Sequence, residues 1–165
     1  MIIIKKSPTA DSRCCDAKNV SKETLIESTQ LHRRDVFRSM DFLSQLVENV
    51  GFEHDRHKLE TMDAFHKAFT GGFVDETWWN EHKKERHHLP PDLEDINLID
   101  ILEHISDCVT AGMARTGKVR PLTISNEKLQ KAFQNTVNLL IRNIKVEVES
   151  GFQPTPVGDP LPRFY

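Results

Sequence analysis

Histidines gather in one part of this 165-residue chain, and histidine is the commonest metal-binding side chain. The sequence contains eight histidines, most of them between residues 54 and 88. Neutral imidazole offers a nitrogen lone pair to a metal near pH 7, and carboxylates complete such sites for borderline or harder ions. The most informative stretch is "HDRHK", which contains His54, Asp55, His57 and Lys58. It is either a charged helix start or the centre of a metal site.

The segments that must position these residues show the apolar spacing of helices. Apolar residues recur every three or four positions between Ser21 and Gly51, and similar patterns predict helices over residues 55–69, 75–88, 97–113 and 125–148. "TGGF" separates the second helix from the third, and "LPPD" ends the third because proline cannot continue a helix. Strand character is limited to residues 2–4. The sequence therefore predicts an all-α, compact bundle of about five helices.

Both ends of the chain lack helical periodicity. We expect residues 1–20 to form an N-terminal arm, residues 21–149 to form the helical domain, and residues 150–165 to form a Pro-rich tail. This tail contains four prolines and two glycines, so it is not a helix. An extended tail can lie over its own domain or over a neighbouring subunit, which leaves a homodimer open.

Composition argues against several classes of protein. A net charge of -3 gives no electrostatic footprint for general nucleic-acid binding. The longest apolar run is far shorter than the roughly 20 residues of a membrane-spanning helix, and "MIIIKK" lacks the apolar stretch of a secretory signal. The three cysteines have no CxxC spacing, which argues against a disulfide framework and a thiolate zinc site. We therefore expect a cytoplasmic protein with no membrane partner.

The order of histidines and aspartates resembles that of the HD-domain metal-dependent phosphohydrolases, an all-α superfamily. "HDRHK" looks like the H-D-x-x-K form of their signature, with His54, Asp55 and Lys58. "WWNEHKKERHH" and "LEHISDCVTAGMARTGK" add a narrower resemblance to small, mostly uncharacterised HD-like proteins of phages and bacteria. The resemblance extends from His32 to Gly117, about half of the chain, and the termini contribute nothing to it.

The resemblance implies metal ligands from several successive helices. The implied ligands are His32, His54, Asp55, His82, His87, His88 and Asp107. Members of the superfamily with two metals carry additional histidines between the HD pair and the last aspartate, and Asp55 would then bridge the two ions. One of His87 and His88 is enough to complete such a set. Each metal-binding role has an ordinary alternative. His32 can be a core histidine that is hydrogen-bonded to backbone, and residues 82–88 can be a solvated helix end.

Asp107 is the preferred last ligand, although a helical wheel places it opposite the apolar face of its helix. A solvated surface aspartate would have the same position. Asp100 and Glu103 share its side of the helix and are the substitutes. His57 can support the metal ligands because it follows the HD pair, and His104 has the position of a structural residue.

The resemblance also implies hydrolysis of a phosphate ester, often in a nucleotide. One or two divalent ions of manganese, iron, zinc, cobalt or nickel suit a mixed histidine and carboxylate site. Asp55 and Lys58 would carry the catalysis. The basic residues that can contact the phosphate or line the rim are Arg33, Lys58, Lys83, Lys84, Arg86 and Arg115. Trp78 and Trp79 can stack on a base, or pack in the core.

Two other functions fit the sequence. A phage-type accessory protein would keep the HD fold and a metal, but would act by binding a partner through its arm and tail. A metal-dependent nuclease would use the local basic patch around residues 83–86, against the acidic balance of the whole chain. Strong salt dependence of substrate binding would distinguish the nuclease.

Overall fold

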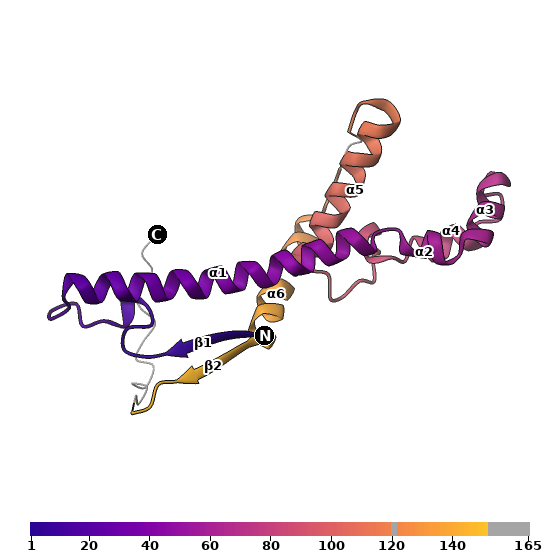
Figure 1. Cartoon of the computed structure of the whole chain (residues 1–165). Coiled ribbons are helices and arrows are strands. Elements are labelled where there is room, and N and C mark those ends of the chain that lie inside the picture. Colours follow the sequence, from indigo (N-terminus) through magenta and orange to yellow (C-terminus); the bar gives the residue numbers. More distant parts are fainter. Residues whose placement is uncertain (120–121, 152–165) are drawn as a thin grey trace. The chain divides into compact units, whose positions relative to one another are not determined.

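The computed structural model describes residues 1–119 and 122–151, and most of these residues are in α-helices (Figure 1). The predicted all-α class is therefore confirmed, with a small two-stranded sheet added. The chain divides into two compact units. One contains Met1–Ser39 and the segment from Asn143 onward, and the other is Met40–Arg142. Among the described residues, no helix combines the length and the apolar character needed to cross a membrane.

The first unit joins the two ends of the described chain in a parallel sheet. Strand β1 spans Ile2–Lys6 and strand β2 spans Ile144–Val148, and Figure 1 shows them side by side. The 3-10 helix η1 (Ser12–Cys14) and the first part of helix α1 (Lys22–Glu53) complete the unit. Arg38 of α1 donates a hydrogen bond of 3.0 Å to the carbonyl oxygen of Ile3, which ties the helix to β1.

The last predicted helix is wrong at its C-terminal end. Helix α6 spans Asn126–Asn143, and the residues that follow form β2 instead of continuing the helix to residue 148. Ile144, Val146 and Val148 alternate with charged residues in this segment. Branched side chains at alternate positions fit a pleated strand better than a helix. The predicted strand at residues 2–4 is confirmed, and it extends to Lys6.

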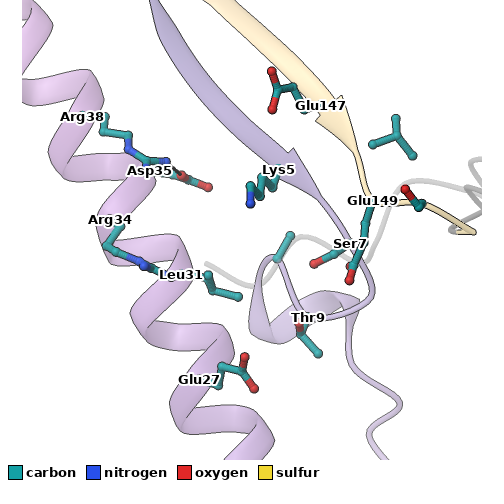
Figure 2. Close-up of a pocket in the computed structure, with 13 residues that line it drawn as sticks. Lys5, Ser7, Thr9, Glu27, Leu31, Arg34, Asp35, Arg38, Glu147 and Glu149 are labelled. Carbon is teal, nitrogen blue, oxygen red and sulfur yellow. Dashed lines mark hydrogen bonds and ion pairs between the residues drawn. The ribbon is translucent and has the colours of Figure 1, made fainter.

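A hollow of about 570 Å³ lies within the first unit, beside α1, β1 and the end of β2 (Figure 2). Its lining includes the cations of Lys5 and Arg34 and the carboxylates of Glu27, Glu147 and Glu149. Charges of both signs meet in one hollow, so it presents no strong field of a single sign for a small ion. The charge pattern therefore points to no ligand class.

The second unit contains the remaining helices and an aliphatic core. It holds the last part of α1 together with α2 (Arg56–Glu60), α3 (Met62–Thr70), α4 (Thr77–His82), η2 (Arg86–His88), α5 (Leu98–Thr116) and most of α6. The core consists of buried Leu89, Ile96, Ile101 and Ala132, with Leu93, Leu98 and Ile124 packed against it. Leu89 directly follows His88. Burial of its side chain therefore anchors the backbone of the two adjacent histidines against the core.

Two predicted helices are interrupted. Residues 55–69 form α2 and α3, which meet at Thr61. The helix predicted over residues 75–88 ends at His82, and η2 follows after a turn. Leu89 then adopts a left-handed backbone with φ of 51°, which is uncommon for a bulky side chain and closes η2. His82 and the pair His87-His88 thus belong to two short elements, and their directions do not follow from one helical wheel.

Candidate metal centre

Asp55 lies at the junction between α1 and α2, in a strained backbone conformation. Its φ of 57° and ψ of 18° are left-handed. Aspartate tolerates the left-handed region better than most residues do, although glycine is the residue most often found there. Residues held in such conformations occur often at functional sites, where the surrounding structure maintains them. The turn separates Asp55 from the regular helix that precedes it and places its carboxylate beside histidines of α4 and η2.

The two oxygens of the Asp55 carboxylate face different histidines. Oδ2 lies 3.7 Å from Nε2 of His54, and the same nitrogen lies 3.5 Å from Oδ1 of Asp107. Oδ1 of Asp55 lies 3.5 Å from Nε2 of His82 and 3.7 Å from Nε2 of His87. Asp55 therefore stands between two sets of ligand atoms, one on each carboxylate oxygen. Such a carboxylate is suited to bridge two ions.

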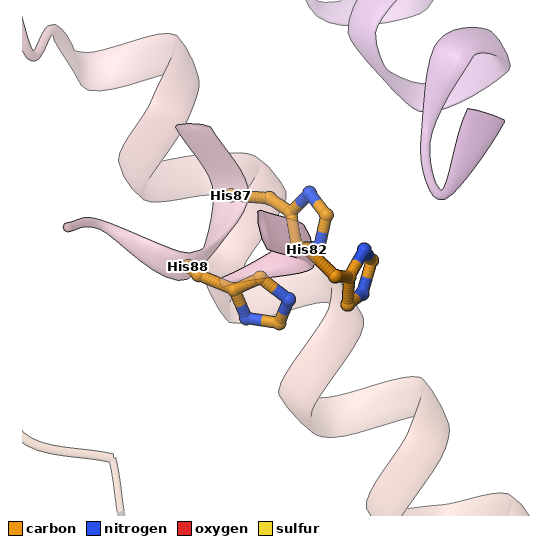
Figure 3. A group of neighbouring side chains, drawn as sticks. All are labelled: His82, His87 and His88. Carbon is orange, nitrogen blue, oxygen red and sulfur yellow. The ribbon is translucent and has the colours of Figure 1, made fainter. Parts of the chain in front are cut away.

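Three histidines from α4 and η2 form the most buried part of this cluster. His82, His87 and His88 each offer a ring nitrogen within 4.8 Å of the others, and Figure 3 shows the three rings gathered together. His82 and His87 are buried, and His88 is half-buried. The same distance limit is met by His54, Asp55 and His87, and by His57, His82 and Glu85. The described residues thus contain overlapping groups that can hold a metal ion.

Six buried polar atoms of this cluster have no hydrogen-bond partner among the described residues. They are Oδ1 of Asp55, Nδ1 of His57, both ring nitrogens of His82, and Nε2 of His87 and His88. Most buried polar atoms in proteins are hydrogen-bonded, because an unpaired one costs on the order of 1–3 kcal/mol. A bound ion would satisfy several of these atoms at once. Imidazole nitrogens together with carboxylate oxygens suit a divalent transition metal.

Burial keeps His82, His87 and His88 in their neutral form. Desolvation, together with repulsion from the nearby charge of Lys58, lowers the pKa of His82 to about 4. Desolvation likewise lowers the pKa of His87 to about 3, with repulsion from His88 and His54 in the same direction. The pKa of His88 is also lowered, mainly by burial. Since neutral imidazole is the form that binds metal, these lone pairs are available at pH 7.

Lys58 keeps the central carboxylate charged. Burial by itself raises the pKa of Asp55, but the hydrogen bond from Lys58 and its positive charge outweigh that effect, and the pKa lies below its ordinary value. Nζ of Lys58 lies 2.5 Å from Oδ2 of Asp55. The spacing of three residues in HDxxK brings the two side chains together across one helical turn. The carboxylate is therefore ionised at neutral pH and ready to bind a cation.

Two residues of α5 hold cluster histidines in place from outside. Nδ1 of His54 lies 3.0 Å from Oε1 of Glu103, so it donates to that carboxylate and Nε2 keeps its lone pair. Nδ1 of His104 lies 2.7 Å from the carbonyl oxygen of His87 and donates to it, which fixes the backbone of η2. A partner on the second ring nitrogen sets the tautomer and orientation of a metal-binding histidine. Glu103 therefore supports the site, and Asp107 lies nearer to the metal-binding nitrogen of His54.

Glu85 is a member of the cluster that the sequence analysis missed. Its carboxylate lies 3.7 Å from Nδ1 of His57, 3.9 Å from Nδ1 of His82 and 3.4 Å from Nδ1 of His87. Desolvation raises its pKa. An acidic residue between His82 and His87 in "EHKKERHH" was the available signal.

Asp100, a substitute candidate for the last ligand, is part of a different interaction. Its side chain is buried and accepts hydrogen bonds of 2.7 Å from both Nε and Nη2 of Arg86. It also accepts from the backbone N–H of Asn97, in the capping box that begins α5. Arg86, predicted to bind substrate, donates as well to Asp95. Its guanidinium is therefore engaged within the protein, and a role in substrate binding stays a prediction.

His32 belongs to the first unit and to none of the groups of potential ligands described above. Its Nδ1 is 3.3 Å from Oδ2 of Asp11, and its side chain is 49% exposed. All residues of those groups belong to the second unit. The proposal that His32 is a ligand stays a prediction, as does the contact of Arg33 with substrate.

The other predicted basic residues are at the surface of the second unit. Lys83 lies over the ring of Trp79, 6.0 Å from its centroid, and Lys84 pairs with Glu81 at 2.7 Å. Arg115 is exposed near the end of α5. Lys58 is the predicted basic residue that directly contacts Asp55.

The metal-free protein is expected to lose stability as the pH falls from about 6.5 toward 4. His82 and His87 stay neutral in the folded chain down to their pKa values of about 4 and about 3, whereas histidine in an unfolded chain binds a proton near 6.5. The unfolded state therefore binds more protons in this window, and acid favours unfolding. Each histidine contributes at most about 1.4 kcal/mol per pH unit. Glu85, whose pKa is raised, titrates in the opposite sense and reduces the slope.

Urea unfolding of chelator-treated protein at pH 7, 6 and 5 would measure this effect. Trp78 and Trp79 both lie in the second unit, so their fluorescence reports its unfolding. A variant carrying His82→Gln and His87→Gln should show a flatter dependence on pH. The explanation is wrong if the variant and the natural chain lose stability equally.

Comparison with protein-family models, with curated proteins and with solved structures finds no match to this chain.

Proposed function

We propose that this protein is an HD-type metal-dependent phosphohydrolase that acts on a nucleotide or a similar small phosphate ester. The observation that carries the proposal is the Asp55 carboxylate, with buried His82 and His87 near one oxygen and His54 near the other. The same nitrogen of His54 also lies near Asp107. A cytoplasmic location belongs to the same proposal. The order of these residues in the chain, which resembles the HD signature, supports it independently of the geometry.

The proposed ligands form two sets that share Asp55. The first set is His54, Asp55 and Asp107, and the second set is Asp55, His82, His87 and His88. A divalent ion of manganese, iron, zinc, cobalt or nickel in such a site neutralises phosphoryl oxygens and lowers the pKa of water. The protein's part is to hold the ligand lone pairs in place, and burial with neutral imidazoles favours this at pH 7.

Lys58 is the proposed phosphate-binding cation. Its side chain is 28% exposed, and its ammonium lies 2.5 Å from Asp55 Oδ2, so a phosphate near Asp55 would also lie near Lys58. Two of its three donor hydrogens remain for a phosphoryl oxygen after the bond to Asp55. Partial burial strengthens this interaction relative to one in bulk water.

The purified protein is expected to contain at least about one transition-metal ion per chain, and chelation should abolish phosphate release. Activity should return when one of the five metals is added. Elemental analysis would give the metal content, and a screen of nucleotides and simple phosphate esters would give the activity. His66→Gln serves as a control and should keep both metal and activity, because His66 is exposed on α3 and outside the described groups of potential ligands.

Two results would contradict the proposal at different points. Absence of bound metal after reconstitution, in the natural chain and in His66→Gln alike, would show that the cluster is not a metal centre. Stoichiometric metal without release of phosphate from any ester in the screen would remove the hydrolase function and favour a partner-binding protein.

A further inference from the structure

A cavity of about 630 Å³ in the second unit lies next to the proposed metal centre. Its lining comes from α2, α3, α4 and the turn before α4. His57 belongs both to this lining and to the group of His57, His82 and Glu85 that can hold a metal. Trp78, also in the lining, stacks on His57 and His82 with ring centroids 5.4 and 5.0 Å apart. The cavity and the metal centre therefore share a wall of aromatic rings.

The remaining lining includes small and apolar residues of α3 and of the turn that follows it. Ala64, Ala68 and Gly71 follow each other at spacings of four and three, so they lie on one side of α3 and its end. Their small side chains leave space that larger ones would fill. Val74 and Trp78 add apolar surface from the turn and from α4. The volume lies within the roughly 300–1,000 Å³ of small-molecule sites, which are mainly apolar with a few polar groups.

The polar groups near Trp78 are already engaged. The indole Nε1 donates to Oγ1 of Thr61 at 2.8 Å, and the Thr61 hydroxyl donates to the carbonyl oxygen of His57 at 2.6 Å. Trp78 is 8% exposed and is stacked against His57, Phe65 and His82, so it adds a small apolar surface to the cavity. Lys67 supplies one charged donor in the lining, and Asp75 and Glu81 supply two carboxylates. One oxygen of Asp75 already accepts from the N–H of Thr77 at 3.0 Å. This combination fits a flat ring with a polar edge better than a sugar or a second phosphate.

We infer that this cavity binds the aromatic ring of a phosphate ester whose phosphate lies at the metal centre. The inference rests on the proposed function and names the substrate class for the same site. A nucleobase and a simple aryl group share the required flat ring. The donor and acceptor of Lys67 and Asp75 favour the nucleobase, because its edge carries groups that pair with both.

Ala68→Leu tests the cavity because it adds bulk to the lining without touching a proposed ligand. We expect the KM for deoxyadenosine 5′-monophosphate to rise about tenfold or more. Hydrolysis of methyl phosphate, which has no ring, and the metal content should both stay unchanged. His66→Leu is the matched control, because it places the same side chain on the same helix outside the lining. Ala64→Leu provides a second variant if Ala68→Leu does not fold.

Binding of deoxyadenosine, measured by calorimetry, gives a second result that needs no hydrolysis. Affinity should fall about tenfold in Ala68→Leu and remain in His66→Leu. Equal affinity and equal KM in all three proteins would overturn the inference. Failure of the natural chain to release phosphate from any ester, with deoxyadenosine affinity still lowered in Ala68→Leu, would overturn the proposed function alone. Phenyl phosphate distinguishes the two ring sources: a KM equal to that of the nucleotide means that any ring is accepted, and a higher KM means that the base edge is recognised.

Discussion

Asp55→Asn is expected to lower kcat/KM for phosphate-ester hydrolysis by at least about a thousandfold and to remove bound metal. The carboxylate has potential ligand nitrogens on both of its oxygens, and the amide loses the negative charge and one acceptor. A thousandfold loss corresponds to about 4 kcal/mol of transition-state stabilisation. Elemental analysis and steady-state kinetics on the same preparation would measure both effects.

Asparagine is the informative replacement at this position. It has nearly the shape of aspartate and also tolerates the left-handed backbone, with φ of 57°, so the fold should remain. Alanine would add backbone strain to the loss of charge and confuse the two causes. Asp63→Asn, at an exposed position in the first turn of α3, is the control and should change neither metal content nor activity. Full activity and metal in Asp55→Asn would show that Asp55 is not a ligand.

The cluster of potential metal ligands could be anticipated because it consists of residue types with distinctive spacing. Packing in an apolar core does not explain His54, Asp55 and the histidines of "EHKKERHH". These residues come together in the structure. Asp107 was doubtful because it lies on the polar face of its helix. That face also carries Glu103, and in the structure both carboxylates approach His54. A polar face can thus line a metal centre as well as face water.

The sequence offered a signal at Glu85, but the contacts of Glu85 and the supporting role of Glu103 depend on how short elements meet. Glu85 lies in the turn between α4 and η2, where the chain leaves the helix that periodicity predicted. Its approach to three histidines follows from that turn. A helical wheel over residues 75–88 assigns no such position. Whether an acidic side chain can act as a metal ligand or can instead orient a ligand histidine depends on the distances between neighbouring elements.

Strand β2 shows a different limit of sequence reasoning. The alternation in Ile144–Val148 was visible, but it follows a strongly periodic helix without a glycine or proline between them. The strand is defined by its partner β1 at the other end of the described chain. A local pattern cannot reveal pairing over such a separation. The predicted Pro-rich tail of residues 150–165 lies almost entirely outside the described residues, which end at Gly151.

Arg86→Leu is expected to lower the free energy of unfolding of the second unit by about 3–5 kcal/mol. Removal of the guanidinium would leave the Asp100 carboxylate, whose side chain is 3% exposed, without its main partner. Arg86 is the first residue of η2, and Asp100 lies in the first turn of α5. The pair therefore fixes η2, with His87 and His88, against α5. Urea unfolding followed by tryptophan fluorescence would measure the loss.

Asp100→Asn separates the buried charge from the packing of Arg86. In the background of Arg86→Leu it removes the unpaired charge and keeps an acceptor for the N–H of Asn97, so part of the stability should return. A double-mutant cycle should then give a coupling of at least about 2 kcal/mol. If Arg86→Leu instead left stability unchanged and raised the KM of every phosphate ester, Arg86 would be a substrate-binding residue. The pairing with Asp100 predicts a large loss of stability and little change in KM. A guanidinium that already donates to two carboxylates has few free N–H donors for a phosphate.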